Sequence, residues 1–202
     1  MISILKLKSG NISSVANMLK HLGHEVEIIH SKSQLHKVKK IILPGIGSFE
    51  ETMNYLKEND LIDSLQNLIL KDEIPTLGIC MGMQILLSSS EEGNFCSGLS
   101  IFSEKLKKFD KNHSKVPHVG WNHLNIINSK EMFLAEKNYF YFSHSFYLED
   151  IDTENTVGIS KNGKKFISAI KKKNVIGVQF HPEKSHRYGF HFLDYFARNF
   201  YV

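Results

Sequence analysis

Cysteine is scarce in this sequence, since the chain of 202 residues contains only Cys80 and Cys96. Two cysteines do not make the multi-disulfide framework of small secreted domains, so we expect a reducing, cytoplasmic setting. No apolar run is long enough to cross a bilayer, and the first residues lack the apolar stretch and cleavage site of a signal peptide. The sequence therefore favours a globular protein without a membrane role.

A strong excess of one charge is also absent, because the formal net charge is only +4. Lysines gather in two short clusters, at residues 37–40 and 171–173, and no aromatic-lined basic groove accompanies them. We interpret both clusters as solvated turns or edges and expect no nucleic-acid partner. The 11 histidines are dispersed without the spacing of a closed zinc site, and His186 and His191 are expected to be surface or partly buried residues. Neither a metal nor another cofactor is predicted.

Apolar residues in the first half follow the periods of alternating strands and helices. We expect strands at residues 2–7, 26–29, 41–43 and 76–79, and helices at residues 12–22, 49–56, 61–70 and 82–91. Asp60 is expected to cap the third of these helices, and residues 44–47 to form a loop after the third strand. Strands that alternate with helices predict a parallel sheet with right-handed crossovers.

The second half changes to short strands separated by turns. We expect strands at residues 119–127, 139–148, 156–159, 166–170 and 175–180, with a hairpin turn at residues 161–164. A final helix is expected at residues 188–201, where Phe192, Phe196 and Phe200 recur every four residues on one apolar face. Because no repeat or linker separates the halves, the chain is predicted to be one α/β domain.

Residues 75–87, PTLGICMGMQILL, have the pattern of a nucleophile elbow. A short buried strand leads to Cys80, and Gly78 and Gly82 leave room for a sharp turn into a helix. The free N–H groups at the beginning of a helix favour an anion and would therefore favour a thiolate at residue 80. The alternative is a small, inert core residue, because free cysteines are usually buried. The elbow alone does not decide between the two interpretations.

A candidate base follows the last apolar strand, which runs into His181-Pro182-Glu183. Open α/β sheets place catalytic groups at such strand ends. A carboxylate at residue 183 can hold one ring nitrogen of His181 while the other faces the thiol. Taken alone, the tripeptide favours an ordinary strand-end histidine beside a solvated acid, but together with the elbow it favours a Cys-His-Glu triad. The order of the three residues differs from that of α/β-hydrolases, in which the acid precedes the histidine.

Five segments together resemble the class I (triad) glutamine amidotransferases. They are LPGIGSF at 43–49, GICMGMQIL at 78–86, KVPHVGWN at 115–122, YFSHSFY at 141–147 and GVQFHPEKS at 177–185. The last segment and the elbow are shared widely in the superfamily. PHVGWN together with YFSHSFY is narrower, and resembles the glutaminase subunits of imidazole glycerol phosphate synthases. One departure is Leu7-Lys8-Ser9 before Gly10-Asn11, where many members have Asp-Tyr-Gly.

The resemblance implies a three-layer α/β/α fold with a mainly parallel central sheet and additional antiparallel strands in the second half. It implies a single glutamine amidotransferase type 1 domain over residues 1–202 and hydrolysis of L-glutamine through a cysteine thioester. Cys80 would be the nucleophile, His181 the acid and base, and Glu183 its orienter. The other implied roles are the oxyanion hole, at Met81, Ile46 and Gly47, and substrate binding, at Gln84, Gly45, Ser143 and His144.

The resemblance also implies a partner, a separate (β/α)8-barrel synthase subunit that receives ammonia in a heterodimer and serves histidine biosynthesis. The positions associated with the contact surface or the tunnel mouth are Asn11, Trp121, Tyr141 and Lys184. From the residues alone, Trp121 and Tyr141 are equally compatible with core aromatics. Two other functions stay open. One is a paralogous glutaminase for a barrel that amidates a surface-sugar precursor, and the other is a non-catalytic regulatory module on the same fold.

Overall fold

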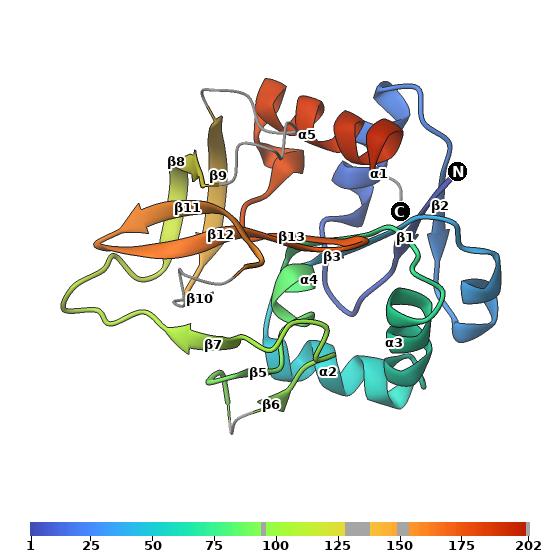
Figure 1. Cartoon of the computed structure of the whole chain (residues 1–202), viewed down its shortest axis with the longest axis horizontal. Helices are drawn as coiled ribbons and strands as arrows, with labels where there is room; N and C mark the ends of the chain where they lie inside the picture. The colour runs from blue at the N-terminus through green and yellow to red at the C-terminus, as the bar shows by residue number, and fades with distance from the viewer. Residues whose placement is uncertain (94–95, 128–137, 149–153, 201–202) are drawn as a thin grey trace.

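The sheet at the centre of the molecule combines strands from both halves of the chain (Figure 1). The computed structural model describes residues 1–93, 96–127, 138–148 and 154–200, and five neighbouring strands in it are parallel. In order across the sheet they are β2 (Val26–Ile29), β1 (Ile2–Leu5), β3 (Ile41–Gly45), β4 (Thr76–Cys80) and β13 (Val175–Val178). The predicted parallel sheet is confirmed, and the pairing of β13 with β4 brings the second half beside the first.

Helices cover both faces of these parallel strands. α1 (Ile12–His21) and α5 (His186–Asn199) lie on one face, and α2 (Phe49–Glu58) and α3 (Ile62–Leu70) lie on the other (Figure 1). The sheet between them completes the three-layer α/β/α arrangement that the resemblance implied. The last helix was expected at residues 188–201. α5 begins two residues earlier, at His186, and ends at Asn199, and residue 201 lies outside the described residues. Within the described part of the chain, no helix is both long and apolar enough to span a membrane.

Each face of the sheet has its own apolar core, because the parallel strands are apolar on both sides. Ile4, Leu19 and Phe196 belong to the core under α1 and α5. Leu43 and Phe49 belong to the core on the side of α2 and α3. All five side chains are fully buried, and burying a side chain of this size contributes roughly 1.5–3 kcal/mol. The phenylalanine stripe predicted for the last helix is thus part of the first core.

Antiparallel strands extend the sheet beyond β13. β12 (Lys164–Lys172) pairs with β13 and also with β11 (Thr156–Asn162), with which it forms the predicted hairpin around Gly163. β11 then pairs with β8 (His118–Ile126), and β8 pairs with β9 (Asn138–His144). These pairings place β8 and β9 next to the end of β13, at the edge where the candidate site lies.

The strand expected at residues 139–148 is interrupted at Ser145. β9 ends before this residue, and β10 (Phe146–Leu148) pairs with β12 and β7 instead of β8. Several short elements have no counterpart in the expectations, because they contain too few residues to show a period. They are η1 (Lys32–Lys37), β5 (Ser89–Ser90), β6 (Cys96–Ser97), β7 (Lys105–Lys108) and η2 (Pro182–Lys184).

The helix after Cys80 is shorter than expected. α4 (Met81–Gln84) begins one residue before residue 82 and ends well before residue 91. The carbonyl groups of residues 85–87 accept hydrogen bonds from the N–H groups of residues 99–102 instead of continuing the helix. A carbonyl that accepts a hydrogen bond from a distant segment does not need a helical N–H as its partner. The local sequence does not show that such a segment replaces the helical hydrogen bonds.

Two other local expectations are wrong. α3 begins after Leu61 without a side-chain cap, and Asp60 instead adopts a φ of 52°. A residue in this left-handed region does not have the extended conformation of a typical N-cap. The loop expected at residues 44–47 is shorter, because Pro44 and Gly45 continue β3 in register with β4.

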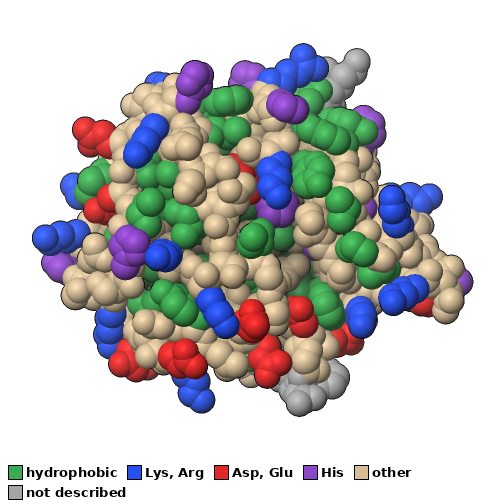
Figure 2. Space-filling view, turned by 180° about the vertical axis from the view of Figure 1, so that it is seen from behind, with side chains coloured by type: hydrophobic (Ala, Val, Ile, Leu, Met, Phe, Trp, Pro, Cys, Tyr) green, Lys and Arg blue, Asp and Glu red, His purple; other side chains and the backbone are tan. Residues whose placement is uncertain are grey.

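Lys40 is buried, although the lysine cluster at residues 37–40 was expected to be solvated. Its side chain is buried, and Nζ donates hydrogen bonds of 2.8 Å to the carbonyls of Phe196 and Ala197 near the end of α5. Burial lowers the pKa of Lys40 to about 8. A cation at the last turn of a helix satisfies carbonyls that lack helical partners. Elsewhere, Lys and Arg side chains are spread over the face shown in Figure 2 rather than gathered in one patch.

Gly82 is a point of close approach between the elbow and its neighbouring strand. A Cβ at residue 82 would lie 1.6 Å from the carbonyl oxygen of Leu43 in β3. Because this neighbour is backbone, Gly82→Ala is expected to lower the free energy of unfolding by about 3 kcal/mol or more, measured by denaturant titration. Gly23→Ala is the matched control, since a Cβ there meets none of the described residues within 4 Å and only the φ of 82° costs about 1–2 kcal/mol. Similar losses in both variants would contradict this role of Gly82.

Candidate active site

Cys80 lies where β4 ends and α4 begins. Its backbone has φ 51° and ψ −105°, outside the regions that non-glycine residues usually adopt. Such a conformation costs about 1–3 kcal/mol and persists only where the surroundings enforce it. Here the pairing with Gly45 in β3 and the close approach of Gly82 to the same strand enforce it. The strand-to-helix turn predicted around the thiol is therefore present, and Cys80 is 5% exposed.

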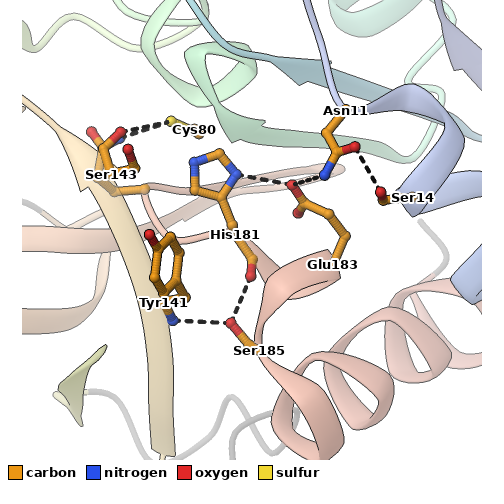
Figure 3. A network of polar contacts seen from close by, with 9 residues as sticks. Asn11, Ser14, Cys80, Tyr141, Ser143, His181, Glu183 and Ser185 are labelled. Carbon is orange, nitrogen blue, oxygen red and sulfur yellow. Dashed lines mark hydrogen bonds and ion pairs between the residues drawn. The ribbon is translucent and has the colours of Figure 1, made fainter. Parts of the chain in front are cut away.

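His181 and Glu183 lie just beyond β13, the strand beside β4. The register pairs Val178 with Ile79, so the residues that follow both strands meet at one edge of the sheet. His181 Nδ1 and Glu183 Oε1 are 2.9 Å apart, and the two side chains are only 1% and 2% exposed. Figure 3 shows the imidazole between Cys80 and Glu183. Its other nitrogen, Nε2, has no hydrogen-bond partner among the described residues and is available to the thiol.

The charges of these three side chains depend on one another. Burial by itself lowers the pKa of His181, but the neighbouring Cys80 thiolate and the Glu183 carboxylate raise it to about 10. His181 is therefore an imidazolium at neutral pH, and its positive charge favours the negative charge that the sulfur carries when it acts as a nucleophile. A thiolate, an imidazolium and a carboxylate in this order can attack a carbonyl carbon and give a proton to the leaving group.

Polar contacts support the acid and the base from the side away from the thiol. Asn11 Nδ2 donates to Glu183 Oε1 over 3.5 Å (Figure 3). The carbonyl of His181 accepts from Ser185 Oγ at 2.6 Å, and Ser185 Oγ accepts from Tyr141 N–H at 3.0 Å. Asn11 and Tyr141, which the resemblance associates with the partner surface or tunnel mouth, therefore also contact the residues around His181.

A cavity of about 370 Å³ opens beside the Cys80 thiol, large enough for a single amino acid. The expected site residues that line it are Cys80, His181, Met81, Gln84, Ile46, Gly47, Ser143, His144 and Lys184. Gly45 is instead buried within β3, and Glu183 lies behind His181. In the described part of the chain, no group of three His, Cys, Asp or Glu side chains could hold a metal ion.

Two polar residues near the site, Gln179 and Glu92, were not predicted from the sequence. Gln84 Nε2 donates to Gln179 Oε1 at 3.0 Å, and Gln179 Nε2 donates to Cys80 Sγ at 3.6 Å, so a buried chain of amides reaches the nucleophile. Gln179 belongs to the GVQFHPEKS segment, and its place in that segment was the available signal. Glu92 lines the cavity, and its Oε2 accepts from Phe49 N–H at 2.7 Å. Glu92 lies outside every segment of the resemblance, so no signal pointed to it.

The backbone donors expected for an oxyanion come from the two sides of Cys80. Met81 follows it at the start of α4, and Ile46 and Gly47 lie in the loop after β3. Ile46 N–H already donates to Ser9 O at 3.3 Å. Gly47 has a φ of 107°, which glycine adopts at little cost. Gly47 is therefore the residue of this loop whose N–H remains as a candidate donor.

Exposed aromatic side chains lie next to the cavity. Trp121 is 37% exposed and stacks on Tyr139 and His186, with ring centroids 5.6 and 5.4 Å apart. The interpretation of Trp121 as a core aromatic is therefore wrong. Trp121 also meets the half-buried Tyr141 ring edge to face at 6.3 Å, and Lys184 Nζ lies 5.6 Å from the centroid of the same ring. Because Lys184 lines the cavity, the aromatic surface and the cavity are continuous.

The sequence is similar to one family over nearly its whole length. Residues 4–198 match the family described as Glutamine amidotransferase class-I. The chain is 40% identical over 201 residues to imidazole glycerol phosphate synthase subunit HisH 2 of Methanococcus maripaludis, covering 98% of this chain and 99% of that protein. It is 42% identical over 203 residues to the subunit HisH of Leptospira interrogans, with the same coverage. It is 38% identical to HisH 1 of Campylobacter jejuni, covering 98% and 100%.

Solved structures share the fold at lower sequence identity. One described as a glutamine amidotransferase has a TM-score of 0.75 at 16% identity and covers 96% of both chains. PurLQS from Thermotoga maritima has a TM-score of 0.77 at 18% identity and covers 98% of this chain and 97% of that one. At these identities the likeness concerns the fold alone. The match over residues 4–198, together with relatives about 40% identical over the full length, shows that this chain belongs to the class I glutamine amidotransferase family.

Proposed function

We propose that this chain is the glutaminase subunit of imidazole glycerol phosphate synthase. It hydrolyses L-glutamine to glutamate and ammonia, and it delivers the ammonia to a (β/α)8-barrel synthase subunit in a heterodimer that serves histidine biosynthesis. The names of its full-length relatives support this assignment. The observation that most directly supports the chemistry is the buried His181 imidazole between Cys80 and Glu183, beside a cavity of about 370 Å³.

Cys80 is the nucleophile in the proposed reaction. Its thiolate attacks the side-chain amide carbon of glutamine, and Met81 N–H stabilises the oxyanion that forms. His181 gives its proton to the amide nitrogen, so ammonia leaves and a glutamyl thioester remains. The neutral His181 then takes a proton from water, which attacks the thioester and releases glutamate and the thiolate. Glu183 orients the imidazole and stabilises its charged form throughout.

Glu92 and the wall at residues 143–146 are assigned to the rest of the substrate. The α-ammonium group of a free amino acid needs an anionic partner, and Glu92 places a carboxylate at the cavity. Ser143 and His144 also line the cavity, and we assign this wall to the backbone of glutamine. Gln84 is already bonded to Gln179, so we assign its amide nitrogen to holding Gln179 against the thiol rather than to the substrate.

The whole chain acts as one glutamine amidotransferase domain in this proposal. The family match spans residues 4–198, and the sheet joins strands from both halves, which supports a single unit. The nucleophile follows β4, whereas the base and the acid follow β13. Neither half of the chain therefore contains a complete site.

The exposed aromatic surface beside the cavity is assigned to the barrel subunit. Trp121, Tyr139 and His186 form a stack there, and the neighbouring Tyr141 and Lys184 connect it to the cavity. Exposed aromatics are enriched in protein–protein interfaces, where they supply large rigid contact areas. A partner docked on this surface would lie next to the point where ammonia is released.

Partner-dependent activation is expected from the loop that contains Gly47. Met81 N–H supplies one oxyanion donor, and Gly47 N–H supplies a second when the peptide between residues 46 and 47 turns toward the cavity. Loss of one such donor costs roughly 10²–10³ in rate. We expect slow glutamine turnover by the chain alone and a rise of roughly 10²–10³-fold when the barrel subunit binds its acceptor substrate, measured as glutamate release.

The same loop can be tested by substitution. Gly47→Ala is expected to reduce the stimulated kcat more than it changes KM, because a φ of 107° disfavours a residue with a Cβ. Gly23→Ala is the control, since residue 23 also has a positive φ but lies at the end of α1, outside the cavity lining. Equal turnover by the chain alone, with partner, and with partner plus acceptor would contradict the activation.

A second client for the ammonia remains a candidate function. The relatives HisH 2 and HisH 1 carry numerals in their names. The alternative for this chain is to supply ammonia to a barrel that amidates a surface-sugar precursor. Both clients require the same glutamine chemistry, so the barrel protein that co-purifies with the tagged chain and the product it forms decide between them. A non-catalytic regulatory module on this fold would release no glutamate with either barrel.

A further inference from the structure

Two buried histidines, His144 in the cavity lining and His118 next to it, take no part in the proposed proton transfers. His118 in β8 is 7% exposed and His144 in β9 is 6% exposed, and they are paired directly in the antiparallel ladder. His118 Nδ1 and His144 Nε2 are 2.9 Å apart. The rings of Phe142 and Phe166 pack against both imidazoles. Each ring nitrogen therefore depends on a protein partner rather than on solvent.

The partners of these nitrogens fix the direction of every hydrogen bond. The carbonyl of Phe146 can only accept, so His144 Nδ1, which lies 2.7 Å from it, donates. In a neutral ring His144 Nε2 is then an acceptor, and the hydrogen between the rings belongs to His118 Nδ1. His118 Nε2 is in turn an acceptor for Asn122 Nδ2, at 3.1 Å.

The amide of Asn122 is oriented independently of the histidines. Its Nδ2 also donates to the carbonyl of Lys161 at 2.9 Å, and its Oδ1 accepts from His123 N–H at 2.8 Å. The chain of hydrogen bonds therefore runs in one direction, from Asn122 through His118 and His144 to the carbonyl of residue 146. An additional hydrogen on the Nε2 of either imidazole would face another N–H and break it.

Burial, and to a smaller extent the surrounding charges, also keep both rings neutral. Burial, and then the charge of Lys115, lower the pKa of His118 to about 4. Burial, together with the smaller effects of His118 and His181, lowers the pKa of His144 to about 3 in spite of its bond to the Phe146 carbonyl. The two histidines therefore remain uncharged across the neutral range, where the direction of the chain is preserved.

The hydrogen-bond chain ends in the wall that faces the nucleophile. Ser143, His144, Ser145 and Phe146 all line the cavity, and Ser143 O lies 3.9 Å from Cys80 Sγ. This wall contains the end of β9, the interruption at Ser145 and the first residue of β10. The bond from His144 to the carbonyl of Phe146 spans the interruption. A side-chain hydrogen bond thus contributes to the shape of the wall in addition to the ladder pairing of its residues.

We propose that Asn122, His118 and His144 form a relay of neutral, directed hydrogen bonds that sets the shape of the cavity wall at residues 143–146. His118 and His144 are then positioning residues for glutamine, an inference that rests on the proposed glutaminase function. Neither histidine exchanges a proton in the reaction. Loss of the relay therefore weakens substrate binding more than it slows the chemical steps.

The first test measures the hydrogen positions directly. Nitrogen-15 NMR of the histidine side chains in the full chain is expected to show His118 and His144 protonated at Nδ1 alone, from about pH 8 to about pH 5. Asn122→Ala should perturb the His118 signals first, because it removes the donor at the far end. A hydrogen on Nε2 of either ring, or a titration of the pair near the usual histidine pKa of about 6.5, would overturn the relay.

The second test measures glutamate release by the complex with the barrel subunit. His118→Leu removes both hydrogen bonds of the ring and is expected to raise the KM for glutamine roughly tenfold, with kcat within about threefold of wild type. His118→Asn keeps an N–H close to the position of Nδ1 and is expected to restore most of the affinity. Where the leucine variant does not fold, Asn122→Ala gives the same readout with a smaller rise in KM.

Phe166→Leu is the matched control for this test. Phe166 packs against both imidazoles without a hydrogen bond to them, so its truncation is expected to lower the melting temperature but not to change KM. Equal changes of KM in the Phe166 and His118 variants would overturn the positioning role. A wild-type complex that releases no glutamate would instead overturn the proposed function, and the NMR experiment would still decide whether the relay exists.

Discussion

Replacement of Cys80 by alanine is expected to abolish glutamine-dependent synthesis by the complex. The elbow presents this thiol to the cavity beside His181, and no other group in the proposed reaction can form the thioester. Loss of the nucleophile of a catalytic triad costs about 10⁶ in kcat. The measurement is glutamate release, together with synthesis from an added ammonium salt. The ammonia-dependent reaction should stay close to wild type, because the proposed function assigns its chemistry to the partner.

The chain offers a matched control in its other cysteine, Cys96. This residue lies in β6, outside the cavity lining, and burial and the charge of Glu50 raise the pKa of its thiol. A raised thiol pKa lowers its reactivity, so Cys96→Ala is expected to change neither activity. Measurable glutamate release by Cys80→Ala, or equal losses from the two alanine variants, would contradict the assignment of Cys80.

The features that the sequence predicted correctly depend on local order. Apolar runs bounded by turn residues predicted β3, β4 and β13, because a strand buried on both faces needs apolar residues throughout. The elbow was predicted because a strand, Cys80 and two flanking glycines are consecutive. The meeting of Cys80 with His181 follows from parallel strands whose carboxyl ends share one edge of the sheet.

The features that were missed depend on contacts between distant segments. Gln179 reaches the thiol of Cys80 only because β13 lies beside β4, and nothing in its own surroundings in the sequence indicates an amide chain. Lys40 is buried because the end of α5 lies above it. The relay likewise needs His118 and His144 to be paired across two strands, and hydrophobic periodicity reports burial but not hydrogen-bond partners.

His181→Ala and Glu183→Gln are expected to separate proton transfer from orientation. His181 moves protons in both halves of the proposed reaction, so its loss should reduce kcat by about 10⁶, as much as loss of the nucleophile. Glu183 only orients the ring and stabilises its charge, so a neutral isostere should cost less, up to about 10⁴. Both variants should leave ammonia-dependent synthesis unchanged, because the proposed reaction assigns that chemistry to the partner. Equal and small effects of both changes on glutamate release would contradict a triad centred on His181.

Glu183→Gln is also expected to change the pH dependence of the reaction. In the wild type, burial lowers the pKa of His181, but Cys80 and Glu183 raise it to about 10, so hydrolysis should fall only as the pH approaches that value. Glu183→Gln removes one of the two charges that raise the pKa of His181, whereas burial still lowers it. The pKa of His181 therefore falls, and the alkaline limb of kcat/KM moves to lower pH. Asn11→Ala is the matched control, because it removes a polar contact to Glu183 but keeps the carboxylate, and it should leave the limb in place. An alkaline limb that stays near pH 10 in Glu183→Gln would show that the Glu183 carboxylate does not stabilise the imidazolium.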